Sequence, residues 1–240
     1  LDIPGTEHGI TSDGFFKLTE QPKKAIIVGG GYIAVEIAGM LNAVGTDTTL
    51  MVRKSLPLTG FDDTIRAVLH ETMSAQGINM ACETELAEIQ KTGKTLTCIT
   101  KAGDIITDVD QVIWATGRHP LTEPLGLDST DVTLNDRGYI DVDDFQNTTA
   151  SGVYALGDVT GKAQLTPVAI AAGRRLAARL FDNQPDLKLD YNLIPTVVFS
   201  EPPIGTIGLS EADARAEYGD AVTVYNTRFT GMFDALTEAR

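Results

Sequence analysis

The sequence predicts an α/β fold in which a parallel sheet is accompanied by an antiparallel meander. The first observation is a short apolar run at residues 25–28, followed by three glycines and a helical pattern to about residue 44. Such a run is typical of a parallel strand covered on both faces. The second observation is a set of three strand-like runs with glycines in the turns, at residues 86–90, 96–100 and 104–107 with Gly93 and Gly103 between them. A chain of 240 residues suffices for one or two domains.

The turn after the first strand has the spacing of a dinucleotide-binding motif. Gly29, Gly31 and Ala34 match the pattern G-x-G-x-x-G/A between a strand and a helix. The first glycine makes the tight turn, the second lets the backbone approach a pyrophosphate, and the alanine keeps helix and strand close. The free N–H groups and the positive dipole end of the helix favour phosphates. Together these features predict a Rossmann-like nucleotide-binding domain.

Two other interpretations of this stretch compete with nucleotide binding. A glycine-rich turn can be purely structural and hold no ligand. Residues 25–44 are also about long enough to cross a membrane, but the three glycines, Glu36 and Asn42 interrupt the apolar run. We therefore expect no membrane span.

The second strand indicates which dinucleotide binds. It is expected at residues 48–52, after Gly45 has ended the helix as a C-terminal cap. The strand ends in Arg53 and Lys54, with no carboxylate beside them. In dinucleotide folds an acidic residue here binds the ribose hydroxyl of NAD, whereas arginine accommodates the 2′-phosphate of NADP. The pair favours NADP, the alternative being two ordinary solvated charges.

Capping residues and apolar runs predict the remaining elements. Three more helices are expected, each beginning at a capping residue: from Asp62 to Gly77, from Thr166 to residue 181, and from Ser210 to Tyr218. Pro167 suits the first helical position. Further strands are expected at residues 78–80, 111–118 (running into a glycine turn), 139–142, 148–158, 196–199 and 221–225. Residues 1–20 and 121–137 are expected to be irregular.

Composition restricts the partners and the compartment. The net charge of −14 argues against nucleic acid or an anionic membrane surface as a partner. Two cysteines, Cys82 and Cys98, occur without a C-x-x-C pattern, which fits a reducing, cytoplasmic compartment. They are predicted to be free thiols, although both could lie on one hairpin.

Several motifs along the chain resemble one enzyme family. They occur in a fixed order, at residues 29–36 (GGGYIAVE), 115–118 (ATGR), 154–160 (YALGDVT), 165–174 (LTPVAIAAGR) and 194–200 (IPTVVFS). Together they resemble the flavoprotein disulfide reductases, most closely the glutathione reductases. The resemblance implies a central piece of such an enzyme, with four segments: residues 1–20 as the end of the first FAD segment, 21–119 as the NADP domain, 120–190 as the second part of a partial FAD domain, and 191–240 as the start of an α+β interface domain.

The resemblance also implies cofactors, partners and roles for particular residues. The cofactors are NADPH and FAD, the substrate is glutathione disulfide, and the whole enzyme is a homodimer. The residues implied for NADP are Gly29, Gly30, Gly31, Tyr32, Ile33, Glu36, Arg53, Lys54, Gly117, Gln164 and Val197. Those implied for FAD are Asp158, Leu165 and Thr166, and the residue implied for the substrate is Arg174. Within these sets Tyr32 would be a movable lid over the nicotinamide pocket. Glu36 would orient the nicotinamide carboxamide.

Three of these residues have simpler interpretations. Glu36 could be a helix carboxylate paired with a lysine. Asp158 could cap a turn. Arg174 could be a solvated charge beside Arg175.

The sequence departs from the family pattern at informative positions. Thr59 stands where the family usually has a second arginine for the 2′-phosphate. No C-x-x-x-x-C pair is present, and His119-Pro120 follows the glycine turn, so we interpret His119 as a loop residue rather than the catalytic histidine. We therefore expect no catalytic residues here, no metal, no disulfide reductase activity from this chain alone, and weak FAD retention. Alternative functions are those of dihydrolipoamide dehydrogenases, mercuric reductases or a non-catalytic NADP-binding module.

Overall fold

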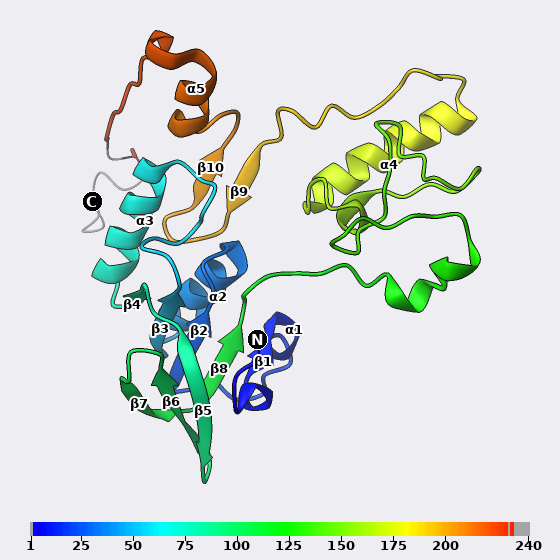
Figure 1. Cartoon of the computed structure of the whole chain (residues 1–240). Helices are drawn as coiled ribbons and strands as arrows, with labels where there is room; N and C mark the ends of the chain where they lie inside the picture. Colours follow the sequence, from blue (N-terminus) through cyan, green and yellow to red (C-terminus); the bar gives the residue numbers. More distant parts are fainter. Residues whose placement is uncertain (1, 230, 233–240) are drawn as a thin grey trace.

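A five-stranded parallel sheet lies at the centre of the protein (Figure 1). The computed structural model describes residues 2–229 and 231–232. The strand order is β1-β8-β2-β3-β4, and every neighbouring pair is parallel. The strands are β1 (Ile10–Thr11), β2 (Lys24–Val28), β3 (Asp47–Val52), β4 (Asn79–Cys82) and β8 (Gln111–Trp114). This confirms the predicted parallel sheet, to which the segment at residues 10–11 adds an edge strand.

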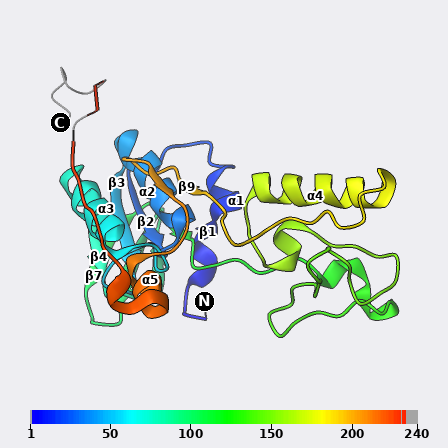
Figure 2. The same ribbon diagram turned by 90° about the horizontal axis from the view of Figure 1, so that it is seen from above.

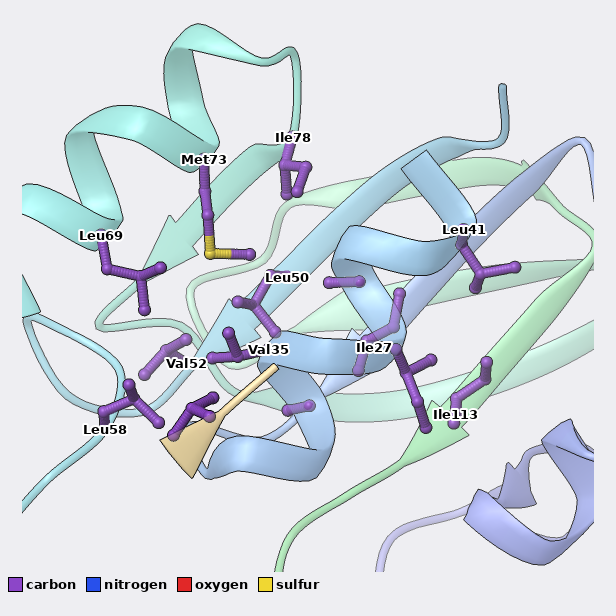
Figure 3. Packing of buried hydrophobic residues seen from close by; sticks show 14 of the residues in the cluster. Ile27, Val35, Leu41, Leu50, Val52, Leu58, Leu69, Met73, Ile78 and Ile113 are labelled. Atoms are coloured by element: carbon purple, nitrogen blue, oxygen red, sulfur yellow. The ribbon is translucent and has the colours of Figure 1, made fainter. Parts of the chain in front are cut away.

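Two layers cover this sheet. Helices α2 (Tyr32–Ala43) and α3 (Asp63–Ala75) pack on one face. Figure 3 shows their core, in which Val35, Leu50 and Met73 interdigitate. The other face packs on an antiparallel meander of β5 (Leu86–Thr92), β6 (Thr95–Thr100) and β7 (Ile105–Val109). Both faces of the sheet are thus covered, and β2 is apolar and buried at residues 25–28, as the sequence predicted.

The predicted helix ends are mostly confirmed. The Asp62 carboxylate accepts the Thr64 N–H and so caps α3. Gly45 follows α2 with φ +91°, a conformation that glycine adopts without strain. At the third helix, α4 (Thr166–Phe181), the prediction is wrong by one residue: Leu165 is the N-cap, and no side chain caps this end.

The second part of the chain forms a separate lobe, which we call the α4 lobe (residues 120–190). Seen from above, it lies beside the sheet, with α4 running along it (Figure 2). It contains long loops and the short helices η2 (Glu123–Leu125), η3 (Leu127–Ser129) and η4 (Gly157–Thr160). We call residues 2–118, which carry the sheet and the meander, the sheet lobe. Its other short helices are η1 (Thr6–His8) and α1 (Ser12–Phe15).

The chain then returns to the sheet lobe. Strands β9 (Thr196–Val198) and β10 (Ile204–Thr206) form an antiparallel hairpin, followed by α5 (Glu211–Tyr218) and η5 (Gly219–Ala221). Val198 and Ile204 are buried in the same core as α2. The Ser210 side chain caps α5, as predicted.

Several predicted strands are absent from the described residues. Residues 139–142 and 148–158 make only the isolated bridges Leu134–Ile140 and Asn147–Tyr154, and residues 221–225 pair with no described strand. In the α4 lobe the apolar pattern reflects burial of Tyr139, Ile140 and Ala155 rather than a sheet. Residues 1–20 were expected to be irregular, but within the described residues 2–20 the segment contains the helices η1 and α1 and the strand β1, which forms because Ile10 pairs with Ile113.

Candidate functional site

The candidate site begins at the carboxyl ends of β2 and β8. The chain runs from β2 outward through β3 to β4, and then crosses to the other side of β2 to form β8. The order of the strands therefore reverses between β2 and β8. In open α/β sheets, ligands bind outside the carboxyl ends at such a switch point. Gly29 follows β2 there, and Gly117 lies shortly after β8.

The glycines of the turn have different surroundings. A Cβ atom at Gly29, where φ is +147°, would lie 2.2 Å from the Ala115 carbonyl oxygen, so this glycine lets β2 and β8 approach. At Gly30 a Cβ would lie 3.1 Å from Val52 Cγ1. At Gly31 and Gly117 it would meet nothing within 4 Å. Gly31 is also the N-cap of α2 and has no side-chain cap. The turn is thus packed at its start and open where a pyrophosphate would approach.

The two basic residues after β3 are exposed. Arg53 and Lys54 follow Val52, and neither forms an ion pair with a residue that the structure describes. Thr59 is exposed in the loop after them. The nearby Arg66 is occupied elsewhere, because it donates to the carbonyls of Leu56 and Pro57 and pairs with Asp63.

Arg118 joins residues from both lobes. Its Nη2 donates to Asp158 Oδ2 at 2.7 Å, and its Nη1 lies 3.4 Å from the Tyr32 hydroxyl. The hydrogen bond to Asp158 raises the pKa of the Arg118 guanidinium further above its ordinary value. Tyr32 is 37% exposed, so its ring stands at the surface beside this ion pair. The predicted lid residue and the predicted flavin residue are therefore brought together.

Both residues of this ion pair line a pocket of about 260 Å³. Its lining combines a guanidinium, an imidazole, a carboxylate and an amide with apolar side chains: Arg118, His119, Pro120, Leu121, Tyr139, Asp158, Val159 and Gln164. Gln164 Nε2 donates to the Tyr139 hydroxyl at 3.0 Å. Leu165 and Thr166 follow directly at the uncapped start of α4. Gln164 and Asp158 thus line the same pocket.

The remaining predicted residues lie on α2, β9 and α4. Glu36 is half-buried, and its Oε1 accepts the Phe199 N–H at 2.8 Å, so its partner is a backbone amide rather than a lysine. Val197 is 48% exposed on β9, and Ile33 packs at the edge of the core of α2. Arg174 is exposed on α4.

Sequence reasoning missed the part played by Arg118 and His119. Arg118 belongs to the quoted ATGR motif, and its position directly after a glycine turn at a strand end was an available signal. His119 lies in a loop, as predicted, yet it lines the pocket. Its proximity to Asp158 depends on how the α4 lobe packs, and the sequence carries no signal for it.

The cysteines take no part in this site. Both are free, as predicted. Burial raises the pKa of the Cys98 thiol to about 11 and also raises that of Cys82. Because a thiolate is the reactive form, both are poor nucleophiles near neutral pH. Within the described residues no group of three or more histidine, cysteine or acidic side chains is arranged to hold a metal ion, and no helix has the length and apolar character to cross a membrane.

Comparison with solved structures finds flavoprotein disulfide reductases. RclA from Escherichia coli, described as an HOCl-induced flavoprotein disulfide reductase, aligns with a TM-score of 0.82 and 29% sequence identity. A Cu(II) complex of a mutant of the same protein aligns with a TM-score of 0.84. In both comparisons 90% of this chain is covered. The chain spans about half the length of these structures, 50% and 49% respectively.

Comparison with protein families gives two adjoining matches. Residues 194–240 match the dimerisation domain of the pyridine nucleotide-disulphide oxidoreductases. Residues 1–173 match the family described as pyridine nucleotide-disulphide oxidoreductase, and they include the glycine turn, Arg118 and Asp158. The chain therefore belongs to the pyridine nucleotide-disulphide oxidoreductase family.

Proposed function

We propose that NADPH binds outside the carboxyl ends of β2 and β8, at what we call the nucleotide site. The observation that carries this proposal is the exposed Arg53, free of ion pairs within the described residues, at the end of β3 and beside an open glycine turn. A guanidinium there suits a 2′-phosphate, and Gly31 leaves room for the pyrophosphate. In this proposal residues 21–119 are the NADP domain. Lys54, Gly30, Gly117 and the exposed face of α2 complete the site.

We further propose that the pocket beside Asp158 holds part of a flavin, with residues 120–190 as the second FAD segment. The groups present fit this cofactor. A carboxylate can accept from a sugar hydroxyl, and the uncapped N-terminus of α4 suits the negative charge of a reduced flavin ring. FAD would supply hydride and electron transfer between the nucleotide and a disulfide. Asp158, Leu165 and Thr166 would hold it after Arg118 releases the Asp158 carboxylate.

For the whole enzyme we propose glutathione disulfide as the substrate. Arg174 is exposed on α4 and is available to a substrate carboxylate. A second candidate is a different disulfide, because RclA, the protein in the similar solved structures, is described as an HOCl-induced flavoprotein disulfide reductase and not as a glutathione reductase. Oxidation of NADPH by an enzyme containing this chain, with glutathione disulfide compared with lipoamide, distinguishes the two.

The match of residues 194–240 to a dimerisation domain supports a homodimer. The two free thiols fit a cytoplasmic location.

The NADPH proposal is tested by Arg53→Glu. A charge-assisted hydrogen bond contributes about 1.5–3 kcal/mol, which corresponds to a preference of about 10- to 150-fold for NADPH over NADH. With Thr59 in place of a second arginine, we expect a value near the lower limit. The substitution should remove this preference, with NADH binding unchanged or improved. Titration calorimetry of the 240-residue chain with both cofactors measures it.

The matched control is Lys94→Glu, the same charge reversal in the turn between β5 and β6. It should leave both affinities unchanged. Raising the salt concentration should weaken NADPH binding to the wild-type chain, since Arg53 is exposed. Equal affinity of the wild type for NADH and NADPH would refute the assignment of Arg53 to the 2′-phosphate.

A further inference from the structure

One carboxylate on α2 connects the proposed nucleotide site to the hairpin β9–β10. Glu36 lies one turn after Tyr32, and residues four apart share a face of a helix. Its Oε1 accepts the backbone N–H of Phe199 at 2.8 Å. The two residues are 163 positions apart in the chain. The bond therefore joins the α2 helix to the segment that matches a dimerisation domain.

This bond belongs to a packed junction. Val198, next to Phe199, is 1% exposed and packs in the core that includes α2. Ile204, on the partner strand of the hairpin, is 8% exposed in the same core. By contrast, Phe199 itself is 77% exposed. The hairpin is thus seated by Val198 and Ile204, while the Glu36 bond fixes the backbone at the end of β9.

The same face of α2 points toward the half of the nucleotide site that lies opposite Arg53. The Tyr32 hydroxyl lies 3.4 Å from Nη1 of Arg118, which follows β8. Arg53 follows β3, on the other side of β2. If the 2′-phosphate lies at Arg53 and the pyrophosphate at Gly31, the nicotinamide half of the nucleotide extends toward the face of Tyr32 and Glu36. The second oxygen of Glu36, Oε2, accepts no hydrogen bond from a described residue. It is available to the amide group of the nicotinamide ring.

We propose that Glu36 couples NADPH binding to the packing of the hairpin β9–β10 against α2. The inference rests on the proposed NADPH site. Once Phe199 has ordered the Glu36 side chain, a nucleotide that uses Oε2 loses less side-chain entropy on binding. Coupling of this kind is reciprocal, so bound NADPH also stabilises the hydrogen bond between Phe199 and Glu36 and the packed hairpin. Glu36 is then a positioning residue for the dimerisation segment as well as a contact for the nucleotide.

The test measures amide hydrogen exchange at Phe199 by NMR, with and without NADPH. In the wild-type chain, NADPH should slow this exchange about five-fold or more. In Glu36→Ala the exchange without nucleotide should be about ten-fold faster, and NADPH should no longer change it. Glu36→Gln keeps an oxygen acceptor, so it should restore most of the protection. Glu71→Ala, the same replacement at an exposed position on α3, is the control and should match the wild type.

The outcomes separate failure of the coupling from failure of the proposed NADPH site. If calorimetry shows NADPH binding to the wild type but the Phe199 exchange is unchanged, the coupling is refuted while the proposed function stands. If no NADPH binds, the proposed function and the coupling fail together. Exchange in Glu36→Ala that is no faster than in Glu71→Ala would show that Glu36 does not hold the hairpin. Because the wild-type comparison needs no variant, the test survives a misfolded Glu36→Ala.

Discussion

Single residues of the glycine turn serve different physical purposes. Gly29 lies where a side chain has no room, since its Cβ would lie 2.2 Å from a backbone oxygen and φ is +147°. Gly31 lies where a Cβ would meet nothing within 4 Å, and in the proposed NADPH site a side chain there would occupy the space of the pyrophosphate. The sequence motif predicts a tight turn at Gly29 and the approach of a pyrophosphate at Gly31. Of the two glycines, Gly29 alone is closely packed against neighbouring backbone.

Alanine at each glycine tests this difference. Gly29→Ala should lower the free energy of unfolding by about 2–4 kcal/mol, because backbone strain and overpacking combine. Gly31→Ala should lower it by only about 0.5–1 kcal/mol, because alanine is a poorer N-cap residue than glycine, but should weaken NADPH binding at least about ten-fold by blocking the pyrophosphate. Urea unfolding and calorimetry measure the two quantities. Equal loss of stability in both variants would contradict the distinction.

At the scale of elements, Asp62 connects two helices. One carboxylate oxygen accepts the Thr64 N–H at the start of α3, and the other accepts the Glu211 N–H at the start of α5, at 2.9 Å in each case. The bond from Glu211, followed by that from Thr64, lowers the pKa of Asp62 below its ordinary value of 3.8. A single side chain thus stabilises α3 and anchors the helix that follows the hairpin.

Replacing Asp62 should affect stability in a pH-dependent way. Asp62→Ala should cost about 1–2 kcal/mol of unfolding free energy at neutral pH, as expected for a lost N-cap. A lowered folded pKa means that the carboxylate contributes fully above pH 3.8 and that its contribution is lost as the pH falls through the lower folded value. The difference between wild type and variant should therefore shrink in acid. Urea unfolding at pH 7 and pH 3 measures it, and Asp47→Ala, an exposed aspartate at the start of β3, should show no such difference at either pH.

At the scale of the whole molecule, the two lobes have separate interiors. The buried hydrophobic side chains of the α4 lobe belong to neither core of the sheet lobe; they are Tyr139, Ile140, Ala150, Ala155, Val168 and Ala172. The Arg118–Asp158 ion pair between the lobes is 41% and 45% exposed, and such pairs contribute at most about 1 kcal/mol. The lobes should therefore unfold independently in the absence of flavin.

Thermal unfolding followed by two probes tests this independence. Trp114 is the only tryptophan and lies on β8, so its fluorescence follows the sheet lobe, whereas circular dichroism follows the helices of both lobes. We expect two transitions by circular dichroism. NADPH at about 100 times its dissociation constant should raise the unfolding free energy of the sheet lobe, followed by fluorescence, by about 2.7 kcal/mol. It should leave the transition of the α4 lobe unchanged. Coincident transitions that shift together would show a single cooperative unit.

The sequence alone determined the features that depend on neighbours in the chain. The strand, glycine turn and helix at residues 24–43, the meander, the caps at Asp62 and Ser210, and the two free cysteines were all predicted correctly. Each depends on backbone preference, apolar periodicity or spacing within a few residues. The family followed from several such motifs in one order, and the family match confirms it. The glutathione substrate and the NADP preference stay predictions, because they rest on single side chains.

Only the tertiary structure decided which distant residues meet. Arg118 contacts Asp158 across 40 positions, and Phe199 contacts Glu36 across 163. Residues 10–11 became a strand because β8 offered an edge. Residues 139–142 stayed without a strand partner because their backbone bonds go elsewhere, as from Ile140 N–H to the Val159 carbonyl in η4. The physical reason is that a strand or an ion pair needs a partner. Local sequence encodes the tendency to pair, whereas the packing of the whole chain determines where the partner lies.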